Sequence, residues 1–91
     1  MLKSEKTMIA RAVVKKLKAQ VIDSNEARLM FAVFEQAVMD AISDVGDTSR
    51  GSAARYLRSD MIHLDLAGVD IDYAARVMKS SGFYDLMPAM Q

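Results

Sequence analysis

Apolar residues recur at helical spacing between residues 5 and 21. The apolar residues that share one side of this segment are Ile9, Val13, Leu17 and Val21, with Ala10 and Val14 beside them. The basic residues on the opposite side are Arg11, Lys15 and Lys18. This segregation predicts a first amphipathic helix whose apolar side packs against the rest of the domain.

A second, wider apolar stripe predicts a helix that begins near residue 24 and runs to about residue 45. Either Asp23 or Ser24 is suited to cap its first turn, and Glu26 follows Asp23 at the spacing of a capping box. The stripe consists of Ala27, Met30, Phe34, Val38, Ala41, Ile42 and Val45, with Phe31 and Ala37 at its edges. Leu29 and Val33 lie outside the stripe, so we expect them to form a further contact, such as a dimer interface.

Glycines and small polar residues interrupt the pattern in "VGDTSRGS", residues 45 to 52, and favour a turn that divides the chain into two halves. The following segment "SAARYLRS" predicts a short helix with Ala54 and Leu57 facing inward and Arg55 and Arg58 facing outward. Ser59 or Asp60 is positioned to cap the next helix.

That next helix is expected to end at about Ala67, because Gly68 follows it. Asp70 is then positioned to cap a last helix over residues 71 to 80. Ser81 and Gly82 close this helix, and Phe83 is expected to pack back on the core. No segment alternates with a period of two, so no sheet is predicted.

The pattern therefore predicts an all-α fold in which an N-terminal amphipathic helical hairpin is followed by three short helices with a helix-turn-helix-like corner. Its 91 residues fit one domain. We divide this domain into the hairpin at 1–45, the helix-turn-helix-like region at 49–82 and a tail at 83–91.

The zero net charge conceals an asymmetry between segments. Residues 1–20 hold six basic residues and one acidic residue, whereas residues 21–49 hold one basic residue and six acidic ones. The basic first helix suits an anionic membrane or nucleic acid, and it also suits pairing with the acidic second helix. We favour pairing, within one chain or between two, because it buries both apolar stripes.

The corner at Gly68 has the requirements of a helix-turn-helix, in which the turn needs a left-handed residue and the second helix presents its outer side to DNA. Val69 fits the buried position after the glycine, and Ala74 and Val77 fit the buried positions of the second helix. Leu64 is larger than the residue usual in the first helix of such motifs. The candidate DNA-binding residues are Arg50, Arg55, Arg58, Tyr73, Arg76 and Lys79. Asp70 and Asp72 would repel phosphate, which argues against DNA.

Residues 55–61, "RYLRSDM", and 66–77, "LAGVDIDYAARV", resemble a family of short phage and prophage proteins of unassigned function. The matching residues in the second segment are Ala67, Gly68, Val69, Asp70, Asp72, Tyr73 and Arg76. The chain departs from the family pattern at Tyr56, Ile71 and Ala74, where tryptophan, proline and valine are commoner. The resemblance implies a phage or prophage origin and a helical fold, and it implies no catalytic residue.

Catalytic and metal chemistry find little support in the sequence. The chain has no cysteine, and its only histidine, His63, has no partners at the spacing of a metal site. "GDTSRGS" lacks the lysine of a phosphate loop and follows a helix rather than a strand. We therefore expect no cofactor, no metal and no enzymatic activity, and we expect a cytoplasmic protein without a membrane segment.

Two functions remain. The first is a small phage or prophage regulator that binds double-stranded DNA as a homodimer through the helix-turn-helix-like region. The alternative is a protein–protein interaction module, such as a phage inhibitor of a host protein, that uses the charge asymmetry and the apolar surface around Leu29 and Val33.

Overall fold

The computed structural model describes residues 3–42, 47–59 and 61–86, with side chains at all of these except 3–4, 47–50 and 59. The described part contains five α-helices, one short 3₁₀-helix and no strand. The helices are α1 (Lys3–Lys18), α2 (Asn25–Ala41), α3 (Asp47–Ser59), α4 (Ile62–Leu66) and α5 (Ile71–Ser80), followed by the 3₁₀-helix η1 (Phe83–Leu86). The all-α prediction, with a long helical pair followed by shorter helices, is confirmed.

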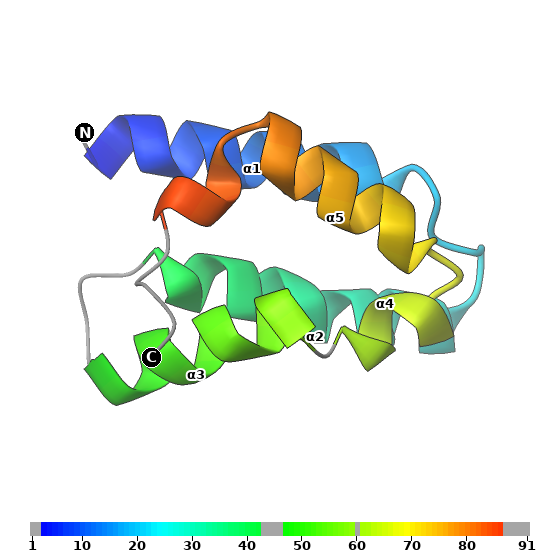
Figure 1. The fold of residues 1–91 in the computed structure, drawn as a ribbon. Coiled ribbons are helices and arrows are strands. Elements are labelled where there is room, and N and C mark those ends of the chain that lie inside the picture. Colours follow the sequence, from blue (N-terminus) through cyan, green and yellow to red (C-terminus); the bar gives the residue numbers. More distant parts are fainter. Residues whose placement is uncertain (1–2, 43–46, 60, 87–91) are drawn as a thin grey trace.

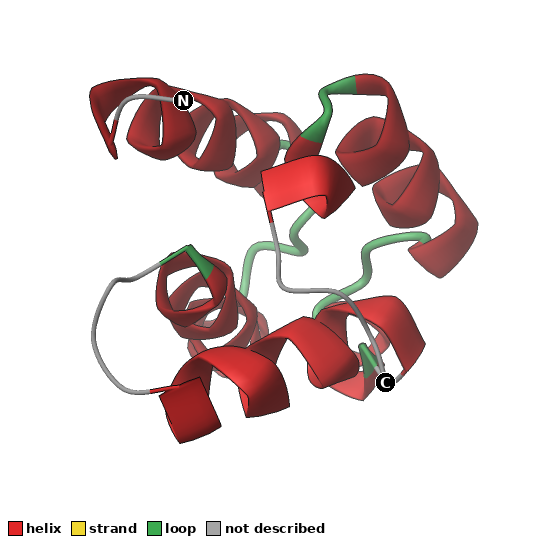
Figure 2. Cartoon of the chain, turned by 60° about the vertical axis from the view of Figure 1, so that its left-hand side comes forward, coloured by secondary structure: helices red, strands yellow, loops and turns green. Residues whose placement is uncertain are grey.

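The helices form two layers (Figure 1). One layer contains α1, α5 and η1, and the other contains α2, α3 and α4, as the turned view also shows (Figure 2). Helices α1 and α2 run antiparallel, as the predicted hairpin requires, but α2 packs most extensively against α3. The predicted hairpin therefore joins the two layers.

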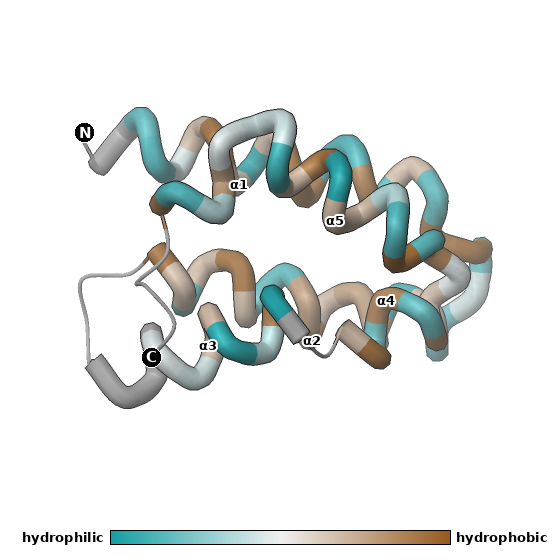
Figure 3. The backbone as a smooth tube through the Cα atoms, in the orientation of Figure 1, coloured by the Kyte–Doolittle hydropathy of each residue, from teal (hydrophilic) through white to brown (hydrophobic). Residues whose placement is uncertain are grey.

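Apolar side chains from every helix fill the space between the layers. Phe34, Leu57, Leu64 and Phe83 are completely buried, and the tube coloured by hydropathy shows apolar and polar residues alternating along each helix (Figure 3). In α2, Phe31 is buried beside Phe34, with ring centroids 5.5 Å apart. Phe31, predicted at the edge of the stripe, therefore belongs to the core, whereas Met30, predicted within the stripe, is only partly buried.

Several helix boundaries differ from the predicted ones. Helix α2 ends at Ala41 rather than near residue 45, and Val45 lies outside the described residues. Helix α3 begins at Asp47, so the predicted turn at 45–52 is largely helical. A Cβ added at Gly51 would meet nothing within 4 Å, and Ala53 and Ala54 are buried. Tertiary packing of α3 on α2 therefore outweighs the low helix propensity of this segment.

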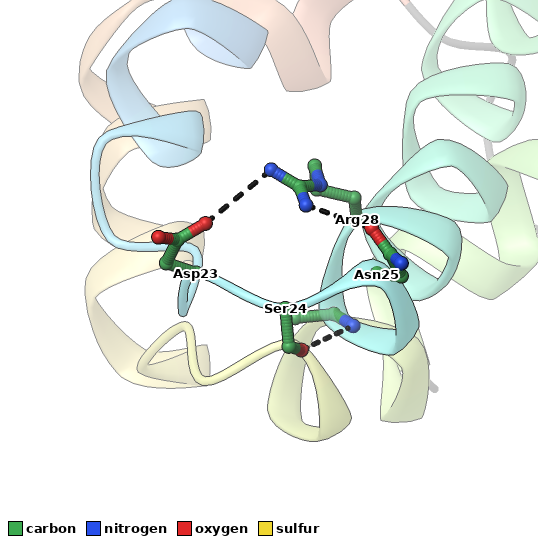
Figure 4. A network of polar contacts seen from close by, with 5 residues as sticks. Asp23, Ser24, Asn25 and Arg28 are labelled. Carbon is green, nitrogen blue, oxygen red and sulfur yellow. Dashed lines mark hydrogen bonds and ion pairs between the residues drawn. The ribbon is translucent and has the colours of Figure 1, made fainter.

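The α1–α2 loop contains both residues predicted as possible N-caps of α2, Asp23 and Ser24 (Figure 4). The Oγ atom of Ser24 accepts a hydrogen bond from the backbone nitrogen of Ala27 at 3.0 Å, so Ser24 is the N-cap of α2. Asp23 instead accepts a hydrogen bond from Arg28 at 3.3 Å, and Arg28 also donates to Asn25 at 2.8 Å. At the start of α4 the N-cap is Met61, without a side-chain cap bond, so the predicted caps Ser59 and Asp60 are wrong.

Candidate nucleic-acid interface

A sharp corner joins α4 to α5 at Gly68. Gly68 has a φ of +90°, in the region that side chains rarely adopt, and its backbone nitrogen donates to the Asp65 carbonyl at 3.0 Å. The nitrogen of Val69 donates to the Leu64 carbonyl at 2.9 Å, and the Val69 side chain is buried. Ala74 is completely buried, and Val77 is buried as well. The local geometry therefore matches the predicted helix-turn-helix-like corner.

Asp70 fixes the first turn of α5. One of its carboxylate oxygens accepts hydrogen bonds from the backbone nitrogens of Asp72 and Tyr73, at 2.9 and 3.4 Å. Asp70 is therefore the predicted N-cap of this helix. Because its carboxylate already occupies the N-terminus of α5, this helix end is not a ready phosphate site.

The α1–α2 loop is attached to the same corner. The backbone nitrogen of Ile22 donates to the Ala67 carbonyl at 3.0 Å, and the Gln20 side chain accepts from the Asp70 nitrogen at 3.3 Å. A Cβ built on Gly68 would lie 2.6 Å from Cγ1 of Ile22. Residues 20–22 of the loop therefore hold the corner in place, and we call this contact the clamp. It joins segments far apart in the chain, so the sequence carries no local signal for it.

The outer side of α5 presents both signs of charge. Asp72, Arg76 and Lys79 are exposed and lie on the side of the helix away from buried Ala74. Tyr73, which we predicted on the same DNA-reading face, is half-buried and packs against the core. The free part of the candidate interface on this helix is therefore built mainly from Arg76 and Lys79, with Asp72 beside them.

The three arginines predicted to approach phosphate from α3 differ in their surroundings. The side chain of Arg50 lies outside the described residues, and Arg55 is exposed. Arg58 is half-buried rather than outward-facing, and it donates a hydrogen bond to the Tyr84 carbonyl at 3.2 Å. Burial raises the pKa of the Tyr84 phenol, and the positive charge of Arg58 partly opposes that rise. Arg58 thus joins α3 to η1 across the two layers.

His63 also has a specific neighbour. Its Nδ1 atom lies 2.8 Å from the hydroxyl of Tyr56, and the two half-buried rings have centroids 5.7 Å apart. This hydrogen bond joins α3 to α4 and helps to orient the short helix that leads into the corner. Tyr56 and His63 are seven residues apart and lie in different helices. The helical spacing of the sequence therefore could not predict this contact.

A second surface lies on the outer side of α2. Leu29 and Val33, predicted to face away from the core, have 62% and 41% of their side chains exposed. They line a groove between α2 and α3 whose other lining residues are Ala32, Gln36, Ala37, Asp40, Ser52 and Ala53. The groove is therefore apolar at one end and polar at the other, where Gln36 donates to Asp40 at 2.9 Å.

The basic and acidic helices face each other across a further groove. Its lining residues are Arg11, Val14, Lys15 and Lys18 from α1 and Glu35 and Met39 from α2. Among the described residues no ion pair joins α1 to α2, and Arg28 at the start of α2 pairs instead with Asp23 of the connecting loop. The expected charge pairing thus brings the two signs into one groove without direct contact.

Other kinds of site find no support in the described residues. They contain no group of three or more histidine, cysteine, aspartate or glutamate side chains arranged to hold a metal ion. Within the same part of the chain, no helix combines the length and the apolar composition needed to cross a membrane. Comparison with protein families, with curated proteins and with solved structures gives no match.

Proposed function

We propose that this chain is a small non-enzymatic regulator, of phage or prophage origin, that binds double-stranded DNA through α5. The observation that supports this function best is the corner at Gly68, which leaves the side of α5 bearing Arg76 and Lys79 exposed. A helix held in this way is suited to the major groove, where arginine reads guanine and lysine contacts guanine or phosphate. The resemblance of residues 55–61 and 66–77 to short phage proteins supports the stated origin.

Because α5 carries both basic and acidic exposed residues, substitutions on it should change DNA affinity in opposite directions. Binding of a short random-sequence duplex is followed by fluorescence anisotropy at ~50 and ~200 mM salt. We expect the affinity to fall steeply with salt, Arg76→Gln to weaken binding and Asp72→Asn to strengthen it. No binding at the lower salt concentration, or variants that both bind like the parent chain, would contradict the proposal.

A protein-binding module is the second candidate, and the groove between α2 and α3 favours it. Exposed Leu29 and Val33 offer an apolar contact to a second copy of this chain or to a host protein. Analytical ultracentrifugation of the parent chain and of Leu29→Ser/Val33→Ser tests self-association. Met8→Ser is a matched control, because Met8 is 70% exposed on α1.

Capture of a host protein by the immobilised parent chain, lost with Leu29→Ser/Val33→Ser and kept with Met8→Ser, would support the interaction module. Charge reversal at Glu35 and Asp40 should also weaken capture if acidic residues guide the partner. A chain that is monomeric and captures no specific protein would argue against this candidate.

A further inference from the structure

We propose that the basic edge of α1, formed by Arg11, Lys15 and Lys18, is a second surface that contacts nucleic-acid phosphates. This inference rests on the proposed function for the class of partner. Its location is argued from a different part of the molecule, because the basic edge borders α2 and the candidate reading face lies on α5. The two surfaces can therefore be tested separately.

The basic edge carries more positive charge than its surroundings neutralise. All three side chains are exposed and line the groove between α1 and α2, in which Glu35 is the one acidic lining residue. Neither Glu35 nor any other described acidic side chain lies within 4.0 Å of their charged nitrogens. The groove therefore keeps a local positive excess that an external anion can neutralise.

The spacing of the three cations suits a polymer of phosphates. Arg11, Lys15 and Lys18 follow one another after four and three residues, so they recur on the same edge of α1. At about 1.5 Å per residue the edge extends for about 10 Å along the helix axis. One DNA strand carries a phosphate about every 3.4 Å of rise along the duplex axis and winds around that axis, so an edge of this length can face more than one phosphate.

The burial of α1 favours a nucleic acid over a membrane. A helix that lies on a bilayer inserts its apolar side among the lipids. The apolar side of α1 is already used within the domain, since Ala10, Val13 and Leu17 are at most 1% exposed. The folded chain therefore offers the charges of this helix to a partner, while Ala10, Val13 and Leu17 stay in the core.

A pair of neighbouring lysines gives a matched comparison. Lys15 and Lys16 are both exposed, but Lys16 does not line the groove and lies on the other part of the exposed side. Duplex affinity is measured by fluorescence anisotropy over a series of salt concentrations for Lys15→Gln, Lys16→Gln and Arg11→Gln/Lys15→Gln/Lys18→Gln. Circular dichroism at each condition checks that the helical content is unchanged.

We expect Lys15→Gln to reduce the slope of log K against log salt by ~0.9, and the triple variant to reduce it by about 2.7. Lys16→Gln should leave the slope unchanged. Equal reductions for Lys15→Gln and Lys16→Gln, or no reduction in the triple variant, would overturn the assignment of the basic edge.

The same measurements on Arg76→Gln separate this inference from the proposed function. A slope lowered by the triple variant but not by Arg76→Gln supports the basic edge and refutes the α5 interface, and the reverse result refutes the basic edge alone. Cosedimentation with vesicles of phosphatidylserine and phosphatidylcholine supplies the remaining arm. Binding to vesicles without binding to the duplex would overturn the inference in favour of a lipid surface.

Discussion

Replacing Gly68 with alanine tests the description of the corner directly. Two costs are expected to add. An alanine held at a φ of +90° loses roughly 1–2 kcal/mol, because its Cβ crowds the backbone in the left-handed region. The new Cβ would also meet Cγ1 of Ile22 at 2.6 Å and Cδ1 at 3.1 Å.

The second cost depends on how Ile22 moves. Turning its side chain out of a preferred rotamer costs about 0.5–1.5 kcal/mol. Moving its backbone instead weakens the hydrogen bond to the Ala67 carbonyl, which contributes a similar amount. Gly68→Ala should therefore lower the free energy of unfolding by about 1.5–3.5 kcal/mol.

Gly82 provides a control of the same chemistry. Its φ is +81°, but an added Cβ would meet nothing within 4 Å, so Gly82→Ala should cost only the backbone part, roughly 1–2 kcal/mol. Urea unfolding followed by circular dichroism measures both variants, and Gly68→Ala is repeated in an Ile22→Ala background. There its cost should fall to that of Gly82→Ala. Equal costs at the two glycines in the parent background would refute the contact with Ile22.

Three further predictions concern single interactions. Asp70→Ala should lower the free energy of unfolding by about 1 kcal/mol in urea titration. Asp70→Asn should lower it much less, since asparagine also caps helices. Tyr56→Phe should cost about 1 kcal/mol in the same assay by removing the 2.8 Å hydrogen bond to His63 while keeping the ring. Burial raises the pKa of Tyr84 in the folded chain above 10.0. The neutral phenol therefore contributes to the free energy of unfolding below about pH 10, and this contribution is lost as the pH rises through the folded pKa. Stability should therefore fall above pH 10.0 less steeply in Tyr84→Phe, and equal slopes would contradict the burial of this phenol.

Local signals in the sequence were sufficient for the last helix and its corner. Gly68 and Asp70 mark its start, Gly82 marks its end, and α5 spans the predicted residues 71–80. These signals act within a few residues of the backbone they control. The exposure of Leu29 and Val33 could also be predicted locally, because both residues lie outside the apolar stripe of their own helix.

Contacts between distant segments were not available from periodicity. The early start of α3 depends on its packing against α2, which outweighs the turn propensity of residues 45–52. The hydrogen bond from Arg58 to Tyr84 joins residues 26 apart, so an arginine predicted to face DNA is partly used within the fold.

The clamp between residues 20–22 and the corner means that helices α4 and α5 are not a portable unit. A peptide cut to these two helices would lack the Ile22 amide and the Gln20 side chain that hold Ala67 and Asp70. Transplanting the pair into another scaffold should therefore require the connecting loop of the first two helices as well. Conversely, substitutions in that loop offer a way to adjust the angle of α5 without altering any residue on its outer side.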